Sequence, residues 1–341
     1  MALIFTEGFD AYGTTEDSAP VPTDAHYRRG WSSGSSPKVQ AGRINGYSMS
    51  YGFSSNISRS GFGSQTTKTV GVALYLENAL PFGSTILALY DSTTIQVKVA
   101  LDASGHLVFY RGSTVLATST EMVSTAAWNY IELKTTINNT TGAYDLRLNG
   151  TSVLSATSLD TQVSANTYWD RLYLSAGGGW DYIYADDLYV TDSTGTDNTG
   201  FLGTIHIETL FPNADVTTDW TTSTGTDHYA LVDENPADDD TTYVEDNVST
   251  DRELFDFPAL TAASDTIFGV TSIVDARVTD ASSVDMKFVN KSSTTVTTGS
   301  AQTVSSTSQA RFEEITEQDP NTSSAWTKTT FEAAQFGFEV A

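Results

Sequence analysis

The chain has no cysteine, only eight prolines, and 17 basic side chains against 42 acidic ones in 341 residues. Without cysteine it cannot form a disulfide, a thiolate zinc site or a thiol nucleophile. No run of 18 apolar residues is present, and the opening residues lack the basic flank of a signal peptide, so we expect neither membrane insertion nor a targeting segment. The net charge of −25 makes nucleic acid and anionic lipid poor partners.

The excess of acidic side chains is uneven along the chain. Residues 1–200 carry 18 acids and 11 bases, whereas residues 201–341 carry 24 acids and 6 bases. Solubility explains most such surfaces, and multivalent cation binding is the specific alternative. The apolar fraction of 39% is too high for a disordered chain, so a packed core is expected.

The apolar side chains alternate with polar ones, which is the pattern of antiparallel strands with one buried face. Examples are Ile95–Leu101, Tyr144–Leu148 and Val284–Phe288. Asn149-Gly150 lies between two alternating runs and predicts a tight hairpin, because both residues tolerate positive φ angles. The one helix signal is a capping box with Thr329 as the N-cap and Glu332 reaching back.

These patterns predict an all-β protein with an N-terminal jelly-roll β-sandwich over residues 1–192. The polar stretch 193–204 lacks periodicity and is predicted to be a flexible linker. Residues 205–341 form a smaller, acidic, β-sandwich-like domain with one short helix. Its predicted strands are Ile205–Leu210, Leu254–Phe257, Ile267–Val278, Val284–Asn290, Gln309–Ile315 and Phe336–Val340.

The patterns of common enzymes are missing from the sequence. There is no Gly-x-Ser-x-Gly elbow and no glycine-rich phosphate loop, and no two histidines lie within four residues of each other. Asp186 and Asp187 are neighbours on a predicted strand, where adjacent side chains point to opposite faces, so they are not expected to converge as a glycosidase pair. We expect no enzymatic activity.

Aromatic residues gather near the end of the predicted jelly roll, around Gly177–Gly179. Tyrosine and tryptophan on an open sheet face can stack against a sugar ring, although large aromatics in a sandwich usually pack in the core. Both interpretations stay open from sequence. The candidate ligand-binding residues are Tyr168, Trp169, Trp180, Tyr182 and Tyr184.

One loop is dense in carboxylates, and hard cations such as Ca²⁺ take several oxygen ligands. Its spacing is not that of an EF-hand, so a solvated acidic turn is the alternative. The candidate ligands are Asp233, Glu234, Asp238, Asp239 and Asp240. No other cofactor is expected.

Several short motifs together resemble a known family. These are Phe5–Gly13, Gly42–Ser50 and Ala185–Val190, followed by Gly200–Pro212 and the pair Trp326-Thr327. Their order is similar to that of tailed-bacteriophage virion proteins with an N-terminal concanavalin A-like, laminin G-like jelly roll. The resemblance covers most of the chain and transfers no catalytic residue.

The resemblance implies a structural protein on the virion surface, assembled in the host cytoplasm. A tail-tip, baseplate or tail-fibre component that contacts other subunits or the host surface is the leading hypothesis. A capsid decoration (cement) protein or head fibre is the first alternative, and a carbohydrate-binding, receptor-binding module is the second. The implied partners are other virion proteins, further copies of the chain in a homo-oligomer such as a trimer, and a host-surface glycan.

Overall fold

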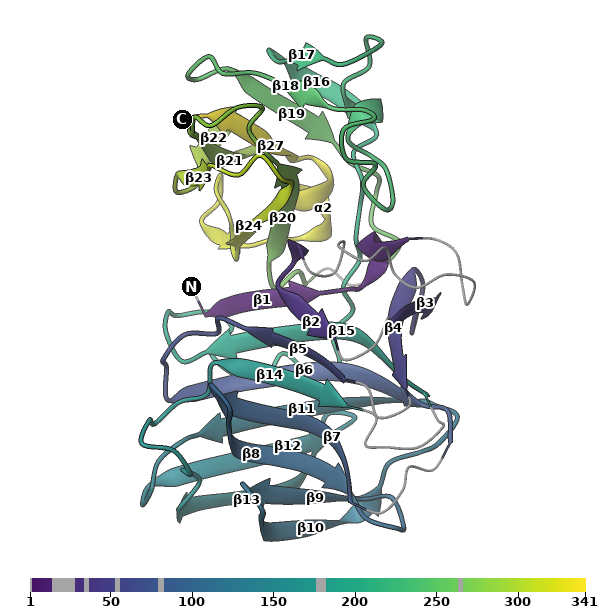
Figure 1. The fold of residues 1–341 in the computed structure, drawn as a ribbon, viewed down its shortest axis with the longest axis vertical. Coiled ribbons are helices and arrows are strands. Elements are labelled where there is room, and N and C mark those ends of the chain that lie inside the picture. The colour runs from purple at the N-terminus through teal and green to yellow at the C-terminus, as the bar shows by residue number, and fades with distance from the viewer. Residues whose placement is uncertain are drawn as a thin grey trace. The chain divides into compact units, whose positions relative to one another are not determined.

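The computed structural model describes residues 2–13, 28–33, 37–52, 56–78, 83–175, 182–262 and 266–341. The chain divides into two units, Met1–Ile207 and Glu208–Ala341. Both units are built almost entirely of antiparallel strands (Figure 1), which confirms the predicted all-β, β-sandwich class. Among the described residues, no helix is long and apolar enough to cross a membrane.

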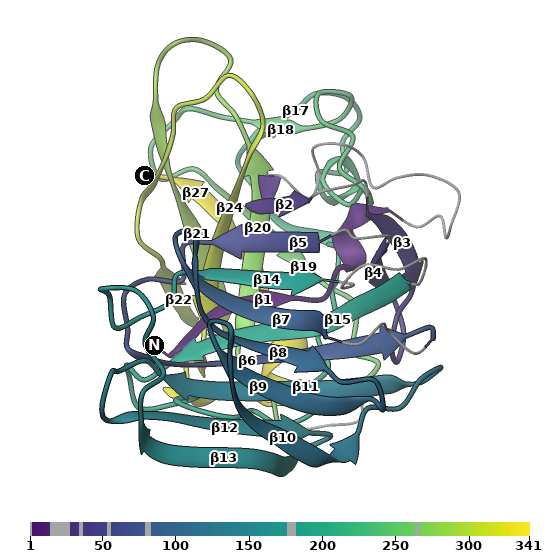
Figure 2. The same cartoon turned by 60° about the horizontal axis from the view of Figure 1, so that its bottom comes forward.

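Unit 1 is a sandwich of two antiparallel sheets, called sheet A and sheet B. The axes of their strands are nearly aligned in Figure 2. Sheet A has the order β13-β12-β11-β6-β15-β4-β3, with β1 paired to β15. Its strands are β1 Leu3–Glu7, β3 Lys38–Ala41, β4 Tyr47–Gly52, β6 Thr67–Leu76, β11 Trp128–Thr136, β12 Gly142–Leu148, β13 Thr151–Leu159 and β15 Tyr182–Asp192. The 3-10 helix η1 covers Asp10–Tyr12.

Sheet B has the order β10-β9-β8-β7-β14-β5-β2. Its strands are β2 Trp31–Ser33, β5 Asn56–Ser60, β7 Ser84–Asp91, β8 Thr94–Leu101, β9 His106–Arg111, β10 Thr114–Met122 and β14 Arg171–Ser175. The alternation of each strand points its apolar side chains into the space between the sheets, where Val72, Leu89 and Val97 are fully buried. The polar positions of β7, β8, β9, β14 and β5 therefore form the outer face of sheet B.

Two local backbone features shape sheet A. Asn149 and Gly150 both have positive φ angles, 51° and 80°, and join β12 to β13, which confirms the predicted hairpin. On β15, the register against β6 shifts between Asp186 and Tyr189, and Asp187 has a φ of 50°. This bulge interrupts the alternation of β15 at the two neighbouring aspartates.

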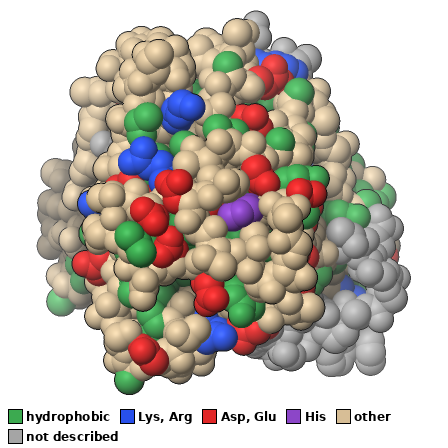
Figure 3. All heavy atoms as spheres, turned by 90° about the horizontal axis from the view of Figure 1, so that it is seen from above, with side chains coloured by type: hydrophobic (Ala, Val, Ile, Leu, Met, Phe, Trp, Pro, Cys, Tyr) green, Lys and Arg blue, Asp and Glu red, His purple; other side chains and the backbone are tan. Residues whose placement is uncertain are grey.

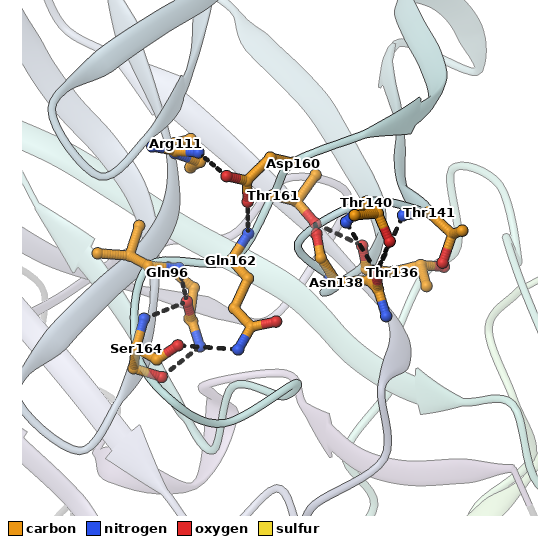
Figure 4. A network of polar contacts seen from close by, with 11 residues as sticks. Gln96, Arg111, Thr136, Asn138, Thr140, Thr141, Asp160, Thr161, Gln162 and Ser164 are labelled. Carbon is orange, nitrogen blue, oxygen red and sulfur yellow. Dashed lines mark hydrogen bonds and ion pairs between the residues drawn. The ribbon is translucent and has the colours of Figure 1, made fainter.

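The chain between β13 and β14 passes from sheet A to sheet B and is fixed by buried polar side chains (Figure 4). The Thr161 hydroxyl donates to the Thr136 carbonyl at 2.7 Å and accepts from the Asn138 backbone N–H at 3.0 Å. The Gln96 side chain, fully buried on β8, accepts from the backbone N–H of Val163 at 2.7 Å and donates to the Ser164 hydroxyl at 2.8 Å. These bonds set the position from which β14 begins.

The segment predicted to be a flexible linker, 193–204, belongs to unit 1, and the boundary between the units lies at Ile207/Glu208. Part of the stretch up to Ile207 is bonded to sheet A. Gly203 N–H donates to Glu132 Oε1 at 2.9 Å, Leu202 N–H donates to the Tyr189 hydroxyl at 3.0 Å, and Ile207 N–H donates to Asp187 Oδ1 at 2.7 Å. The predicted strand Ile205–Leu210 is wrong, because these residues pair with no neighbouring strand: Ile205 N–H donates to the Gly203 carbonyl, and Ile207 N–H donates to the Asp187 side chain.

Unit 2 contains a sheet of order β16-β19-β27-β21-β22, with β23 paired to β21, and three two-stranded ribbons. Phe255, Phe288 and Phe338 of this sheet belong to one cluster of buried side chains, which is the main core of the unit. The sheet strands are β16 Ala214–Thr218, β19 Arg252–Asp256, β21 Val284–Ser292, β22 Thr295–Thr298, β23 Gln302–Val304 and β27 Gln335–Val340. The ribbons are β17 Thr221–Thr222 with β18 Val244–Glu245, β20 Val270–Ala276 with β24 Ala310–Thr316, and β25 Gln318–Asp319 with β26 Ser324–Ala325; the 3-10 helix η2 covers Tyr229–Leu231.

The predicted C-terminal helix exists as α2, Lys328–Glu332, but its cap differs from the prediction. Thr327 is the N-cap, and its side chain accepts from the backbone N–H of Thr330. The Thr330 side chain completes the capping box by accepting from the backbone N–H of Thr327. Glu332 does not complete the box, because two threonines at the right spacing lie nearer to the helix start.

Candidate functional site

The structure separates the predicted aromatic residues. Trp169 is fully buried in the core of unit 1, where its indole N–H donates to the Thr135 hydroxyl at 3.2 Å and its ring packs on Phe62. Its prediction as a ligand-binding residue is therefore wrong, and the core-packing alternative holds for it. Tyr168 precedes it and is half-buried, and Trp180 lies outside the described residues.

Tyr182 and Tyr184 lie on β15, where the Tyr184 side chain points to the outer face of sheet A. Register places Tyr184 beside Tyr75 of β6, and Tyr75 beside Trp128 of β11. The rings of Tyr75 and Tyr184 stack on each other, with centroids 5.2 Å apart and planes inclined by 7°. Each of these two rings therefore covers one face of the other.

The acidic loop does not assemble a metal site. Among the residues that the structure describes, which include all five predicted ligands, no group of three or more His, Asp or Glu side chains converges to hold an ion. Glu234 and Asp238 instead accept hydrogen bonds from the Thr242 hydroxyl, and Asp240 forms an ion pair with Arg277 at 2.7 Å. Asp233 and Asp239 belong to the same turn and complete no ligand set. On the face drawn in Figure 3, acidic side chains are spread with lysines and arginines among them.

Asp186 and Asp187, the neighbouring acids of β15, both bond to Arg43. Arg43 joins them, since its backbone N–H donates to Asp186 Oδ2 at 2.7 Å and its Nε donates to Asp187 Oδ2 at 2.6 Å. Asp187 also accepts from His206 Nδ1 at 3.0 Å. The pair thus holds Arg43 and the end of unit 1, which is a structural task.

The outer face of sheet B carries a different set of side chains. Cross-strand register aligns Tyr110 of β9, Lys98 of β8, Ala88 of β7, Tyr173 of β14 and Ser58 of β5 in one row. The neighbouring row pairs Tyr90 of β7 with Arg171 of β14. We call the half-buried side chains of these two rows the tyrosine–cation face; they are Tyr90, Lys98, Tyr110, Arg171 and Tyr173.

Contacts within the tyrosine–cation face hold its members in place. Tyr90 and Tyr173 have ring centroids 5.6 Å apart with planes inclined by 52°. The Arg171 guanidinium lies over the Tyr90 ring at 5.4 Å and donates to the Ser58 hydroxyl at 3.0 Å. The Lys98 ammonium lies 4.6 Å from the centroid of Tyr110. These are cation–π distances, and they keep both cations on the surface of the sheet.

The electrostatics of this face differ from those of the whole chain. The strands β2, β5, β7, β8, β9 and β14 contain a single acid, Asp91, and four bases, of which Lys98 and Arg171 lie on the outer face. Asp91 shares the inward-facing positions of Leu89 on β7, and its carboxylate accepts from Ser164 and Asn166. Burial, and then the nearby Tyr173, raise the pKa of Tyr90, so its hydroxyl stays protonated at neutral pH. The face therefore offers phenol hydroxyls, aromatic rings and positive charge.

Sequence reasoning missed these residues for a topological reason. Alternation places Lys98 on the polar side of its strand, but Arg171 and Tyr173 lie about 70 positions later. Only the crossover that inserts β14 beside β7 brings them to the same face. The one available signal was the lack of acidic residues in these strands of an otherwise acidic chain.

A search against models of known protein families and a search of curated proteins found no match. Solved structures with a similar fold do match, at low identity. Domain 4 of AbnA, a GH43 extracellular arabinanase from Geobacillus stearothermophilus, in complex with arabinotriose, is 16% identical, with a TM-score of 0.40, and the match covers 56% of this chain and 92% of that one. Cellulose induced protein, Cip1, is 12% identical, with a TM-score of 0.39, and the match covers 56% of this chain and 98% of that one. Alginate lyase Aly36B is 10% identical at a TM-score of 0.42, with the same coverages.

Proposed function

We propose that unit 1 is a carbohydrate-binding module and that its ligand lies on the tyrosine–cation face of sheet B. The observation that carries this proposal is that Tyr90 and Tyr173 are half-buried and in contact across the neighbouring strands β7 and β14, with a third half-buried tyrosine, Tyr110, on β9 of the same face. A tyrosine presents an apolar ring with a hydroxyl at its edge, which matches the apolar C–H face and polar rim of a sugar.

Rigidity supports the same proposal. The five side chains stand on strands of one sheet and contact one another in two groups, Tyr90 with Tyr173 and Arg171, and Lys98 with Tyr110, so little side-chain freedom is left to lose when a ligand binds. Between Lys98 and Tyr173 lies only the small side chain of Ala88, on the strand between theirs. With strands spaced about 4.8 Å apart, Lys98 and Tyr173 stand about 10 Å from each other. Such a platform suits an extended chain of sugars.

Replacing one tyrosine of the face tests the proposal. In the full-length protein, Tyr173→Ala should weaken glycan binding, measured on an array of immobilised polysaccharides, by about tenfold or more. Tyr75→Ala is the matched control, because it removes a half-buried tyrosine from the outer face of sheet A. Equal losses for the two variants, or binding unaffected by Tyr173→Ala, would contradict the assignment.

The setting in which this binding acts is a second proposal, supported by the order of the sequence motifs that resemble phage virion proteins. We propose that the module is displayed on a virion, at the tail tip, baseplate or tail fibre, with a capsid decoration protein or head fibre as the alternative position. Antibody labelling of intact particles distinguishes the two positions. Particles that lack the protein altogether would refute both.

A further inference from the structure

We infer that the glycan bound by the tyrosine–cation face is acidic and carries carboxylate groups, as a uronic-acid or sialic-acid polymer does. This inference rests on the proposed function and adds the chemical class of the ligand. The observation that supports an acidic ligand is the pattern of ion pairs that the basic side chains of the chain form, and not the tyrosines.

Arginines of this acidic protein commonly have a carboxylate partner. Examples lie in both units: Arg29 with Glu7, Arg43 with Asp187, Arg111 with Asp160, Arg147 with Asp145, Arg252 with Glu339, Arg277 with Asp240, and Arg311 with Asp275. Arg171 is an exception, because it takes part in no ion pair with any residue that the structure describes; Lys98 takes part in none either, as is also true of Lys134, Lys287 and Lys291. With 42 carboxylates available in the chain, an arginine without a carboxylate partner, on the same face as an unpaired lysine, indicates a site that is kept clear of acids.

Both cations keep hydrogen-bond donors for a ligand. An ammonium has three donors, and the Lys98 ammonium lies against the Tyr110 ring, which leaves its remaining sides open. Arg171 uses its Nη2 for the Ser58 hydroxyl and retains further N–H groups of the guanidinium. Charge-assisted bonds from such donors to a carboxylate are about twice as strong as neutral ones. Tyrosine rings beside them can contact the sugar that bears the carboxylate.

The charge of the whole chain selects among anionic ligands. A net charge of −25 repels a dense polyanion at long range, so an anion must be held by local contacts. A polymer with one carboxylate per sugar suffers less repulsion than a heavily sulfated one. We therefore commit to carboxylated glycans over sulfated glycans.

The test uses the full-length protein on immobilised polygalacturonate, alginate and sialylated glycan, each beside its methyl ester, and on heparin as the sulfated probe. Methyl esterification removes the charge and keeps the sugar. The expected result is binding to at least one carboxylated probe, with affinity about tenfold lower for its ester and for Lys98→Met and Arg171→Gln. Lys287→Met in unit 2 removes the same charge elsewhere and should bind as the unmodified protein does.

The other outcomes separate the inference from the proposed function. Equal binding to a polymer and its ester, unaffected by Lys98→Met, would overturn the acidic ligand and leave a glycan-binding module. Preference for heparin would overturn the carboxylate assignment. Binding to no probe would count against both. Unchanged unfolding midpoints of the variants confirm that a loss of binding is not a loss of folding.

Discussion

At the scale of single residues, unit 1 relies on buried carboxylates that hold other parts of the chain. Asp187 is fully buried and bonds to Arg43, to His206 and to the backbone of Ile207. Glu132 is equally buried and accepts from the Tyr189 hydroxyl and from Gly203. Removing one partner of such a pair leaves an uncompensated charge in the interior, which is more costly than the net worth of the pair.

Asp187→Asn should therefore lower the free energy of unfolding of unit 1 by about 3–5 kcal/mol. The matched control is Asp145→Asn, whose carboxylate is partly exposed and lies 3.4 Å from Arg147, and this change should cost less than about 1 kcal/mol. Urea unfolding followed by tryptophan fluorescence measures both. Similar losses in the two variants would show that the Asp187 cluster does not stabilise the fold.

Asp186 makes a prediction about pH. Burial, and then the adjacent Asp187, raise the pKa of Asp186 to about 8. In the unfolded chain an aspartate has a pKa of about 3.9, so between about pH 4 and pH 8 the folded state binds more protons than the unfolded state. The stability of unit 1 should fall as pH rises through this window and level off above it. Asp186→Asn should flatten the decline, and an unchanged slope in urea titrations at several pH values would refute the assignment.

At the scale of elements, close packing of neighbouring strands fixes which residues each strand can tolerate. Gly71 of β6 lies opposite Tyr189 of β15, and a Cβ atom added at Gly71 would lie 2.1 Å from the Tyr189 ring. The ring cannot move easily, because its hydroxyl is bonded to Glu132 and to the Leu202 N–H. Gly71 is therefore required by the close approach of a ring and not by its own backbone angles.

Gly71→Ala should destabilise unit 1 by about 1–3 kcal/mol through overpacking. The loss should shrink when Tyr189→Leu is introduced as well, because the smaller side chain leaves room for the methyl group. A double-mutant cycle of unfolding free energies measures this coupling. Additive losses would mean that the ring and the methyl group do not meet.

The sequence was most informative about individual strands and turns. Strict alternation and the Asn149-Gly150 turn predicted β12, β13 and their hairpin, because local chemistry fixes both features. Local pattern could not predict the bulge at Asp187, since its carboxylate is stabilised by Arg43, more than 140 positions away. For the same reason it could not place Arg171 and Tyr173 beside Tyr90. Trp169 was misassigned because composition does not say to which side of a loop a ring turns.

At the scale of the whole molecule, the division between the units falls after Ile207. Residues 200–207 supply hydrogen bonds to the carboxylates of Glu132 and Asp187, and Phe201 lies under the Arg147 guanidinium at 3.7 Å. An N-terminal fragment that ends at the sequence-predicted boundary, residue 192, lacks these contacts. A fragment that ends at residue 207 keeps them all.

The fragment 1–207 should accordingly be more stable than the fragment 1–192 by about 3 kcal/mol or more, since it retains hydrogen bonds to two buried carboxylates. Thermal unfolding of the two purified fragments, followed by circular dichroism, measures the difference. Equal midpoints would show that residues 193–207 act as a simple connection, as the sequence first indicated.

The outer face of sheet B is the proposed binding site for an acidic glycan. A crystal structure of the 341-residue chain with an oligosaccharide of the carboxylated glycan that it binds most tightly tests this site. The expected result is a sugar ring against Tyr90 or Tyr173, with its carboxylate within hydrogen-bond distance of Lys98 or Arg171. A sugar bound instead at Tyr75 and Trp128 on sheet A, or anywhere on unit 2, would contradict it.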